Sequence, residues 1–382
     1  AAAELPGQKE ALTVLELPQG TKVTPMLEQY IYWKEQYPDC LLFFRMGDFY
    51  EMFFDDAQTA SSVLDIVLTS RSRDSENAIP MAGVPFHSVE SYLGRLVSAG
   101  YRVAICEQMT EPDGKTLVQR EVTRIVTPGT WLPENSESDG HLAACLFDGS
   151  EVSVAFLTTG SGSLRTGTFP ENEAASLISS FKPDEILIRK GQKERLSSVL
   201  SDLADANIVE REKGEFSAQT GAEWLCRKWD IATLNSMGLD DSDPSAGAAY
   251  AALHYLEETQ FSQARHVLGL VPILPAENLI LDQSTQVNLE LTEPQKTSLY
   301  SVLNRCNTPM GKRMLKDWIL SPLQDIDEIT KRQNAIGELI DKRTLSFRLK
   351  NILAGCHDMA KAIGRLTLHM GSPADLLSIR ET

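Results

Sequence analysis

Residues 45–54, RMGDFYEMFF, place an acidic side chain among aromatic ones, next to a Gly-Asp pair that is typical of a β-turn. Side chains alternate between the faces of a strand, so in a hairpin Phe49 and Glu51 project from one face and Tyr50 from the other. A phenyl ring at a rigid tip can enter the minor groove of a duplex, stack on a base and kink the helix. The neighbouring carboxylate is repelled by phosphates, so in the groove it must either accept a hydrogen bond from an exposed base edge or be partly protonated. The pair would therefore discriminate against intact duplex.

Burial in a hydrophobic core is the alternative interpretation of residues 43–54, because aromatic residues in strands usually pack inside. Burial explains four of the aromatic residues, which are Phe43, Phe44, Phe53 and Phe54. It does not explain Phe49 and Glu51, because burying a carboxylate without a partner costs several kcal/mol. We therefore expect Phe49 and Glu51 at the surface and the other rings in the core.

Composition sets limits on the class of protein. The 382 residues are enough for about two to four domains, and 42% hydrophobic with 23% charged residues is typical of a globular protein. The net charge of −17 disfavours broad non-specific binding to nucleic acid, although residues 296–350 carry eleven Lys or Arg against six Asp or Glu. No apolar run approaches the roughly 18 residues that span a membrane, and residues 1–22 lack the pattern of a signal peptide. Six cysteines without a CxxC pair indicate reduced thiols in the cytoplasm and no zinc–cysteine site.

The common catalytic motifs are absent from the sequence. The nearest match to the P-loop GxxxxGK[ST] ends at Gly114, Lys115 and Thr116 but has Met109 at its first glycine position. GxSxG and HExxH do not occur. The scattered histidines are expected to be surface or core residues and not ligands; they are His87, His141, His254, His266, His357 and His369. We expect no enzymatic activity, no cofactor and no metal site in this chain.

The first expected domain, residues 23–131, alternates helices and strands around one sheet, after a poorly ordered tail over residues 1–22. Thr24 and Pro25 are typical of a helix start, Asp55 or Asp56 would cap a second helix, and Ser88 would cap a third. The expected helices are 24–37, 55–64 and 89–100, and the expected strands are 40–46, 49–54, 64–70, 79–86, 101–109 and 120–130.

Two further domains are expected after a turn-rich linker at 131–140. Three strands followed by helix–strand alternation predict a ribonuclease-H-like α/β domain over 132–215. From 216 to 382 strand signals nearly vanish and amphipathic helices follow, with Thr308 and Asp325 as N-caps. The predicted fold class is multidomain, with two α/β domains followed by an all-α part.

A ribonuclease-H-like domain raises two-metal nuclease chemistry as an alternative, which needs carboxylates that converge on the first strand. Asp148 and Glu151 instead fall in a turn, and Asp184 and Glu185 begin a later strand. This placement disfavours a nuclease.

Several long blocks of sequence together resemble one family. In order, they are TPMLEQYIYWKEQYPDCLLFFRMGDFYEMFFDDA, IPMAGVPFHSVESYL, VAICEQM, RIVTPGT, LILDQSTQVNLELT and SVLNRCNTPMGKRMLKDWILSPL. They resemble the MutS family of DNA mismatch repair proteins over residues 22–345. The resemblance implies that Phe49 and Glu51 belong to the family's Phe-x-Glu motif, in which the ring stacks on a mispaired base and the carboxylate hydrogen-bonds to it. It also implies groove or backbone contacts by Arg45, Met46, Asp48, Arg71, Pro80 and Met81.

The same resemblance implies identities for the three expected domains. In order, they would be a mismatch-binding domain, a ribonuclease-H-like connector and a helical core/lever domain. The family's clamp and P-loop ATPase are missing, so the chain is expected to be the N-terminal portion of a longer bacterial, cytoplasmic, nucleoid-associated protein. ATP and Mg²⁺ would be cofactors of the full-length protein. That protein would be a homodimeric sliding clamp that bends mismatched DNA and recruits MutL. The portion given by this sequence would be a monomer. Gln286 and Val287 stand where the family usually has basic residues. A family member that binds branched or recombining DNA is the alternative, although such members lack a working Phe-x-Glu.

Overall fold

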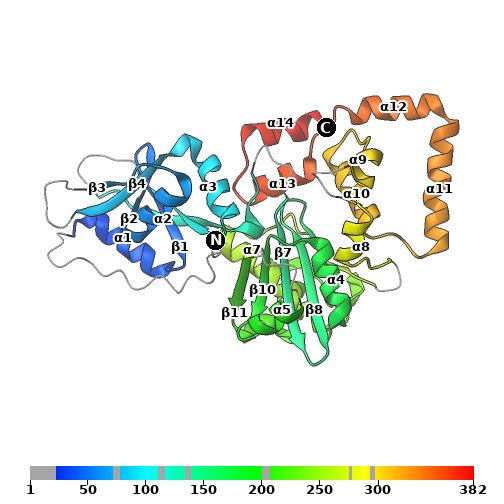
Figure 1. Cartoon of the computed structure of the whole chain (residues 1–382), viewed down its shortest axis with the longest axis horizontal. Coiled ribbons are helices and arrows are strands. Elements are labelled where there is room, and N and C mark those ends of the chain that lie inside the picture. The colour runs from blue at the N-terminus through cyan, green and yellow to red at the C-terminus, as the bar shows by residue number, and fades with distance from the viewer. Residues whose placement is uncertain are drawn as a thin grey trace. The chain divides into compact units, whose positions relative to one another are not determined.

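The computed structural model describes residues 23–71, 78–110, 117–133, 139–199, 207–274, 278–292 and 297–382 (Figure 1). The predicted tail, residues 1–22, lies outside this description. The chain divides into two compact units, the first comprising Ala1–Pro133 with Thr259–Phe261 and the second comprising Glu134–Glu258 with Ser262–Thr382. Each unit contains a six-stranded sheet with helices, so the predicted mixture of α/β and helical structure is confirmed.

The first unit is built on a mixed sheet with the strand order β3-β4-β2-β1-β5-β6. Only β1 and β5 pair in parallel, and the other neighbours are antiparallel. The strands are β1 (Cys40–Met46), β2 (Phe49–Phe53), β3 (Thr69–Arg71), β4 (Ile79–Pro85), β5 (Arg102–Gln108) and β6 (Arg120–Val126). The helices are α1 (Pro25–Gln36), α2 (Phe54–Leu64) and α3 (Val89–Ser98).

Both faces of this sheet are buried against helices. On one face Phe43 and Met52 pack with Leu64 of α2 and Leu93 of α3. On the other face buried side chains of β1 and β2 pack with α1, the main ones being Leu42, Phe44, Phe53, Leu27 and Tyr30. β1 therefore reads as a nearly continuous apolar run, as expected for a strand covered on both sides.

The start of α2 differs from the prediction that Asp55 or Asp56 caps it. The helix begins at Phe54, one residue after Phe53 at the N-cap position, and has no side-chain cap. Asp56 is instead buried inside the unit, where it accepts hydrogen bonds from Tyr30 and from the backbone of Leu42 and pairs with Lys34. The capping prediction was wrong because an acid at a helix start can serve either a local cap or a distant partner.

The expected strand 64–70 is also wrong, since only Thr69–Arg71 form β3. Asp65 takes a left-handed conformation (φ 52°) that ends α2, and the apolar Val67 is 82% exposed. Ser88 does occupy the N-cap position of α3, but its hydroxyl donates to the carbonyl of Pro85 (3.3 Å) and does not cap the helix.

The second unit contains a sheet with the order β11-β10-β7-β8-β9-β12. The first three strands in sequence form an antiparallel meander, and β10 and β11 add in parallel beside β7. The strands are β7 (His141–Asp148), β8 (Glu151–Thr158), β9 (Ser163–Pro170), β10 (Glu185–Arg189), β11 (Asn207–Arg211) and β12 (Val271–Pro272). Side chains from α4 (Glu171–Phe181) and α5 (Lys193–Val199) complete the core on one face.

Helices make up most of the second unit after β11. The alanine-rich α7 (Ser245–Gln260) is fully buried over much of its length and packs closely on α6 (Ala218–Trp229). A Cβ atom at Gly221 would lie 2.6 Å from the carbonyl oxygen of Ala246, so this approach requires glycine.

The remaining helices are α8 (Gln283–Asn288), α9 (Leu299–Leu303), α10 (Pro309–Leu320), α11 (Ile326–Asp341), α12 (Arg343–Leu353), α13 (Met359–Thr367) and α14 (Pro373–Glu381). The caps predicted for α1, α10 and α11 (Thr24, Thr308 and Asp325) each accept a backbone N–H at the helix start. No helix in the described ranges is long and apolar enough to cross a membrane.

Candidate nucleic-acid interface

A tight hairpin joins the two central strands of the first sheet, and its turn lies at one end of the sheet. β1 and β2 are joined by Gly47 and Asp48, so that Met46 pairs directly with Phe49. Gly47 has a φ of 61°, a conformation that favours glycine. The carbonyl of Asp48 accepts the N–H of Phe86 (2.9 Å), which ties the end of β4 to the turn. The turn predicted from the Gly-Asp pair is therefore present and is anchored from two strands.

Exposure divides the hairpin residues as the sequence predicts. Phe49 is 46% exposed, Glu51 is half-buried, and Tyr50 between them is buried on the opposite face. The other four aromatic residues, Phe43, Phe44, Phe53 and Phe54, are all buried. Core packing thus accounts for those four rings but not for Phe49.

Gly83 keeps the face around Phe49 and Glu51 open. It pairs with Glu51 in β4, and a Cβ atom built on it would lie 3.8 Å from Cγ of Glu51 and 3.8 Å from Cδ1 of Phe49. A larger residue would cover both side chains. Two of the predicted contact residues share this face, because Met46 pairs with Phe49 and Met81 pairs with Phe53. Both methionines are partly buried against the core beneath.

Arg45 lies on the opposite face of the hairpin, opposite Tyr50. Its guanidinium lies 3.6 Å from the ring centroid of Phe86, its Nε donates to the carbonyl of Gly47, and it pairs with Glu107 (3.9 Å). The hydroxyl of Tyr50 donates to Glu107, and burial, followed by this carboxylate, raises the pKa of Tyr50. The structure therefore does not bring Arg45 together with Phe49 and Glu51.

The other predicted contact residues are more dispersed. Asp48 is exposed in the turn. Pro80 precedes Met81 in β4 and so lies on the face opposite to Phe49. Arg71 ends β3, and its side chain lies outside the described residues.

Arg120 is a neighbour of Glu51 that the sequence did not reveal. It is buried, donates to the carbonyls of Arg45 (2.7 Å) and Val118 (3.0 Å), and holds its guanidinium 5.0 Å from the ring centroid of Phe44. Burial lowers the pKa of Arg120, while the nearby Cys106 and Glu51 groups raise it. Since Phe44 pairs with Glu51, a fixed cation lies on the same face as the carboxylate. An exposed ring, an acceptor and a held cation can together stack on a planar group and hydrogen-bond its edge.

The acidic residues considered for a nuclease have other positions. Asp148 and Glu151 pair at the hairpin end of β7 and β8. Asp184 accepts a backbone N–H at the start of β7 (2.8 Å), and the buried Glu185 accepts the hydroxyl of Tyr255 (2.8 Å). The latter two therefore serve structural hydrogen bonds.

Family models match three consecutive parts of the chain. MutS domain I matches residues 24–135, MutS domain II matches 140–268, and MutS domain III matches 284–382. Together these matches cover most of the sequence.

Several curated relatives are similar over nearly the whole chain. The DNA mismatch repair protein MutS of Myxococcus xanthus is 39% identical over 94% of this chain and 41% of its own length. The proteins of the same name from Granulibacter bethesdensis (39% identical) and Methanosarcina barkeri (35% identical) also align over 94% of this chain, and over 39% and 43% of their own lengths. The chain thus spans about two fifths of the length of these relatives.

Proposed function

The chain belongs to the MutS family of DNA mismatch repair proteins, and from this membership we propose that it binds duplex DNA at mispaired bases. The observation that carries the proposal is the exposed Phe49 ring beside Glu51 on a face that Gly83 leaves open. The ring would enter the minor groove and stack on a mispaired base. Unstacking a base step costs a few kcal/mol, and this cost falls where pairing is already defective.

Glu51 supplies the discrimination in this proposal. A carboxylate in a groove lined by phosphates is repelled, so intact duplex gains nothing from its presence. A mispaired base exposes a hydrogen-bonding edge from which Glu51 can accept. Arg120 on the same face would hold the ionised carboxylate in place.

Net charge limits how tightly the chain alone would bind. Residues 41–130 carry eight Lys or Arg against twelve Asp or Glu, a net charge of −4. Affinity for DNA depends mainly on cations that neutralise phosphates. We therefore expect weak binding by this chain, with selectivity supplied by the hairpin.

The rest of the predicted function extends the proposal to a longer protein. ATP and Mg²⁺ would bind outside these residues, because no P-loop occurs among them. Such a protein would be a homodimer that bends DNA, becomes a sliding clamp and recruits MutL in the bacterial cytoplasm. We also infer a ribonuclease-H-like fold for the second sheet, and its antiparallel meander with β10 and β11 in parallel supports this assignment.

Binding to three DNA substrates tests the proposal against its alternative. We expect tighter binding to a duplex with one G·T mismatch than to the same duplex fully paired, and no preference for a four-way junction. Fluorescence anisotropy at low ionic strength, where contacts between Lys or Arg and phosphates are least screened, measures all three affinities. A preference for the junction would favour a family member that binds branched DNA.

Gly83→Val is expected to weaken mismatch preference without unfolding the first unit. The valine methyl groups would cover the gap between Phe49 and Glu51, and a β-branched residue suits a strand. A base–aromatic stack contributes roughly 1–3 kcal/mol. Losing about 1 kcal/mol of this stacking free energy corresponds to about a fivefold loss of preference for the mismatched duplex. Gly83→Ala is the matched control, because its Cβ would make only ordinary contacts, the nearest at 3.4 Å to the carbonyl of Tyr50. Equal mismatch preference in the two variants would contradict the open-face argument.

Glu51→Gln is expected to tighten binding to paired duplex more than binding to mismatched duplex. The change removes the repulsion between carboxylate and phosphates but keeps a hydrogen-bonding group of the same shape. The ratio of the two affinities should therefore fall while both affinities rise. Titrations at two salt concentrations check the cause, since an electrostatic gain shrinks as salt increases. Weaker binding to both duplexes would show that Glu51 attracts and does not discriminate.

A further inference from the structure

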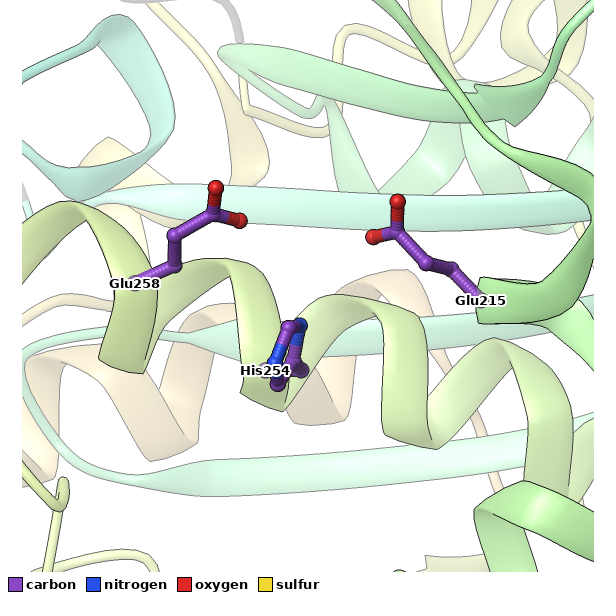
Figure 2. A group of neighbouring side chains, drawn as sticks. All are labelled: Glu215, His254 and Glu258. Carbon is purple, nitrogen blue, oxygen red and sulfur yellow. The ribbon is translucent and has the colours of Figure 1, made fainter.

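A cluster of possible metal ligands lies in the second unit. His254 and Glu258 are one turn apart on α7, and Glu215 comes from the 3₁₀ helix Lys213–Phe216 that follows β11. One ligand atom from each residue lies within 4.8 Å of the other two. Figure 2 shows the two carboxylates facing each other, with the imidazole of His254 between and below them.

The donor atoms define the class of ion that would fit. The i, i+4 spacing places His254 and Glu258 on one helix face, and the third ligand comes from a separate element. One imidazole nitrogen with two carboxylate oxygens suits zinc and similar divalent transition metals, whereas Mg²⁺ and Ca²⁺ favour oxygen alone. Metal–ligand bonds of about 2.0–2.2 Å require the donors to move closer, which rotation of the long glutamate side chains can supply.

Arg211 already occupies the cation position between the two carboxylates. Its Nη2 lies 2.7 Å from Oε2 of Glu215, and the same nitrogen contacts Oε2 of Glu258. Although burial lowers the pKa of Arg211, the charges of Glu258 and Glu215 raise it above its ordinary value. The pair of carboxylates therefore needs a positive charge, and at present a guanidinium supplies it.

His254 has hydrogen-bonding capacity that its neighbours do not use. Its Nδ1 is buried and has no hydrogen-bond partner in the part of the chain that the structure describes. The ring is held by aromatic neighbours, with centroids 5.1 Å from Tyr250 and 6.1 Å from Trp224. Buried polar atoms are normally paired, so an unused nitrogen in an imidazole ring that lies beside two carboxylates calls for an explanation.

We propose that Glu215, His254 and Glu258 bind one divalent transition-metal ion of the zinc class, with water completing its coordination and in exchange with the Arg211 guanidinium. The ion would fasten the 3₁₀ helix after β11 to the buried helix α7. Competition from the Arg211 guanidinium would weaken the affinity of the site for the ion. The proposal does not depend on DNA binding by the first unit.

Titration of the 382-residue chain with Co²⁺, followed by absorption, and with Zn²⁺, followed by calorimetry, tests the site. We expect one equivalent of either ion to bind, with affinity reduced more than about tenfold in His254→Ala and in Glu258→Gln. His357→Ala is the matched control and should bind normally, because His357 and Glu381 form an exposed pair (3.5 Å). Absence of binding, equal loss in the control, or an intense thiolate-to-cobalt band that places the ion on cysteine would each overturn the proposal.

Arg211→Gln tests the exchange directly. Removing the competing guanidinium should tighten Co²⁺ binding. If Arg211 has only a structural role, its loss would leave the affinity for Co²⁺ unchanged or weaker. Unchanged or weaker affinity would therefore overturn the proposed exchange. Circular dichroism establishes that the variant is folded. If it is not, Arg211→Lys serves instead, because lysine keeps the charge but loses the two-pronged geometry. That variant should bind Co²⁺ more tightly than the unmodified chain, and unchanged or weaker binding would again overturn the exchange.

Mg²⁺ in excess should leave the Co²⁺ spectrum unaltered, and displacement by Mg²⁺ would overturn the assigned ion class.

Discussion

Phe49→Ala is expected to abolish most of the preference for mismatched over paired duplex while leaving the fold intact. The ring is 46% exposed and lies at the rim of the sheet, so its removal leaves no buried cavity. A base–aromatic stack contributes roughly 1–3 kcal/mol, which corresponds to about a 5- to 150-fold change in affinity for the mismatched duplex. Affinity for paired duplex should change little, because the ring gains no stack there. Anisotropy titrations with matched G·T and G·C duplexes measure the ratio.

Phe86→Ala provides a matched control for this experiment. Phe86 is also exposed (41%) and lies at the same turn, but its ring is covered by the guanidinium of Arg45 (3.6 Å). Phe86→Ala should therefore keep the mismatch preference, and Phe49→Trp, which retains a flat ring, should keep most of it. If Phe49→Ala still favoured the mismatched duplex as strongly as the unmodified chain does, the assignment of Phe49 as the stacking residue would fail.

The hairpin was predictable because its signals are local. A Gly-Asp turn, alternation of side chains and the cost of burying Glu51 together place Phe49 and Glu51 on an open face. Helix starts with a threonine and a proline, such as Thr24 and Thr308, were predictable for the same reason. These features depend on residues within a few positions of one another.

Features that depend on distant partners were not predictable. Arg120 reaches Phe44 and the side of Glu51 only because β6, β5 and β1 are neighbours in the sheet. His254 was expected to be a surface or core residue, and its proximity to Glu215 follows from the close approach of the 3₁₀ helix Lys213–Phe216 to α7. A histidine with no HxxH or HExxH pattern gives no local sign of such a site. Sequence spacing detects ligands on one helix face but not those that folding brings together.

Lys34→Met is expected to destabilise the first unit by about 3–5 kcal/mol, the usual cost of leaving a buried ion-pair partner without its counter-charge. The Nζ of Lys34 donates to Oδ1 of Asp56 (2.8 Å) and to the carbonyl of Cys40 (2.6 Å), and the side chains are only 9% and 1% exposed. Asp56 also accepts from Tyr30 and from the backbone of Leu42, so it joins α1, β1 and α2. Urea unfolding, with hydrogen exchange of residues 23–133 as the readout, measures the loss. Lys190→Met is the matched control, because Lys190 forms an exposed pair with Glu212. This variant should not shift the midpoint of urea unfolding.

The pH dependence of this loss identifies its cause. Burial raises the pKa of Asp56 above its ordinary value of 3.8, although Lys34 lowers it, so removing Lys34 should raise it further. A carboxyl group whose pKa is raised in the folded state favours folding while it is protonated and loses that contribution as pH rises through the raised value. The penalty of Lys34→Met should thus be largest near neutral pH and shrink as the solution is acidified. The double variant Lys34→Met with Asp56→Asn, which carries no charge at this position, should recover much of the stability at neutral pH and show no such pH dependence. If the loss of stability in Lys34→Met stays constant with pH, its cause is the lost packing of the lysine stem and not the unpaired carboxylate of Asp56.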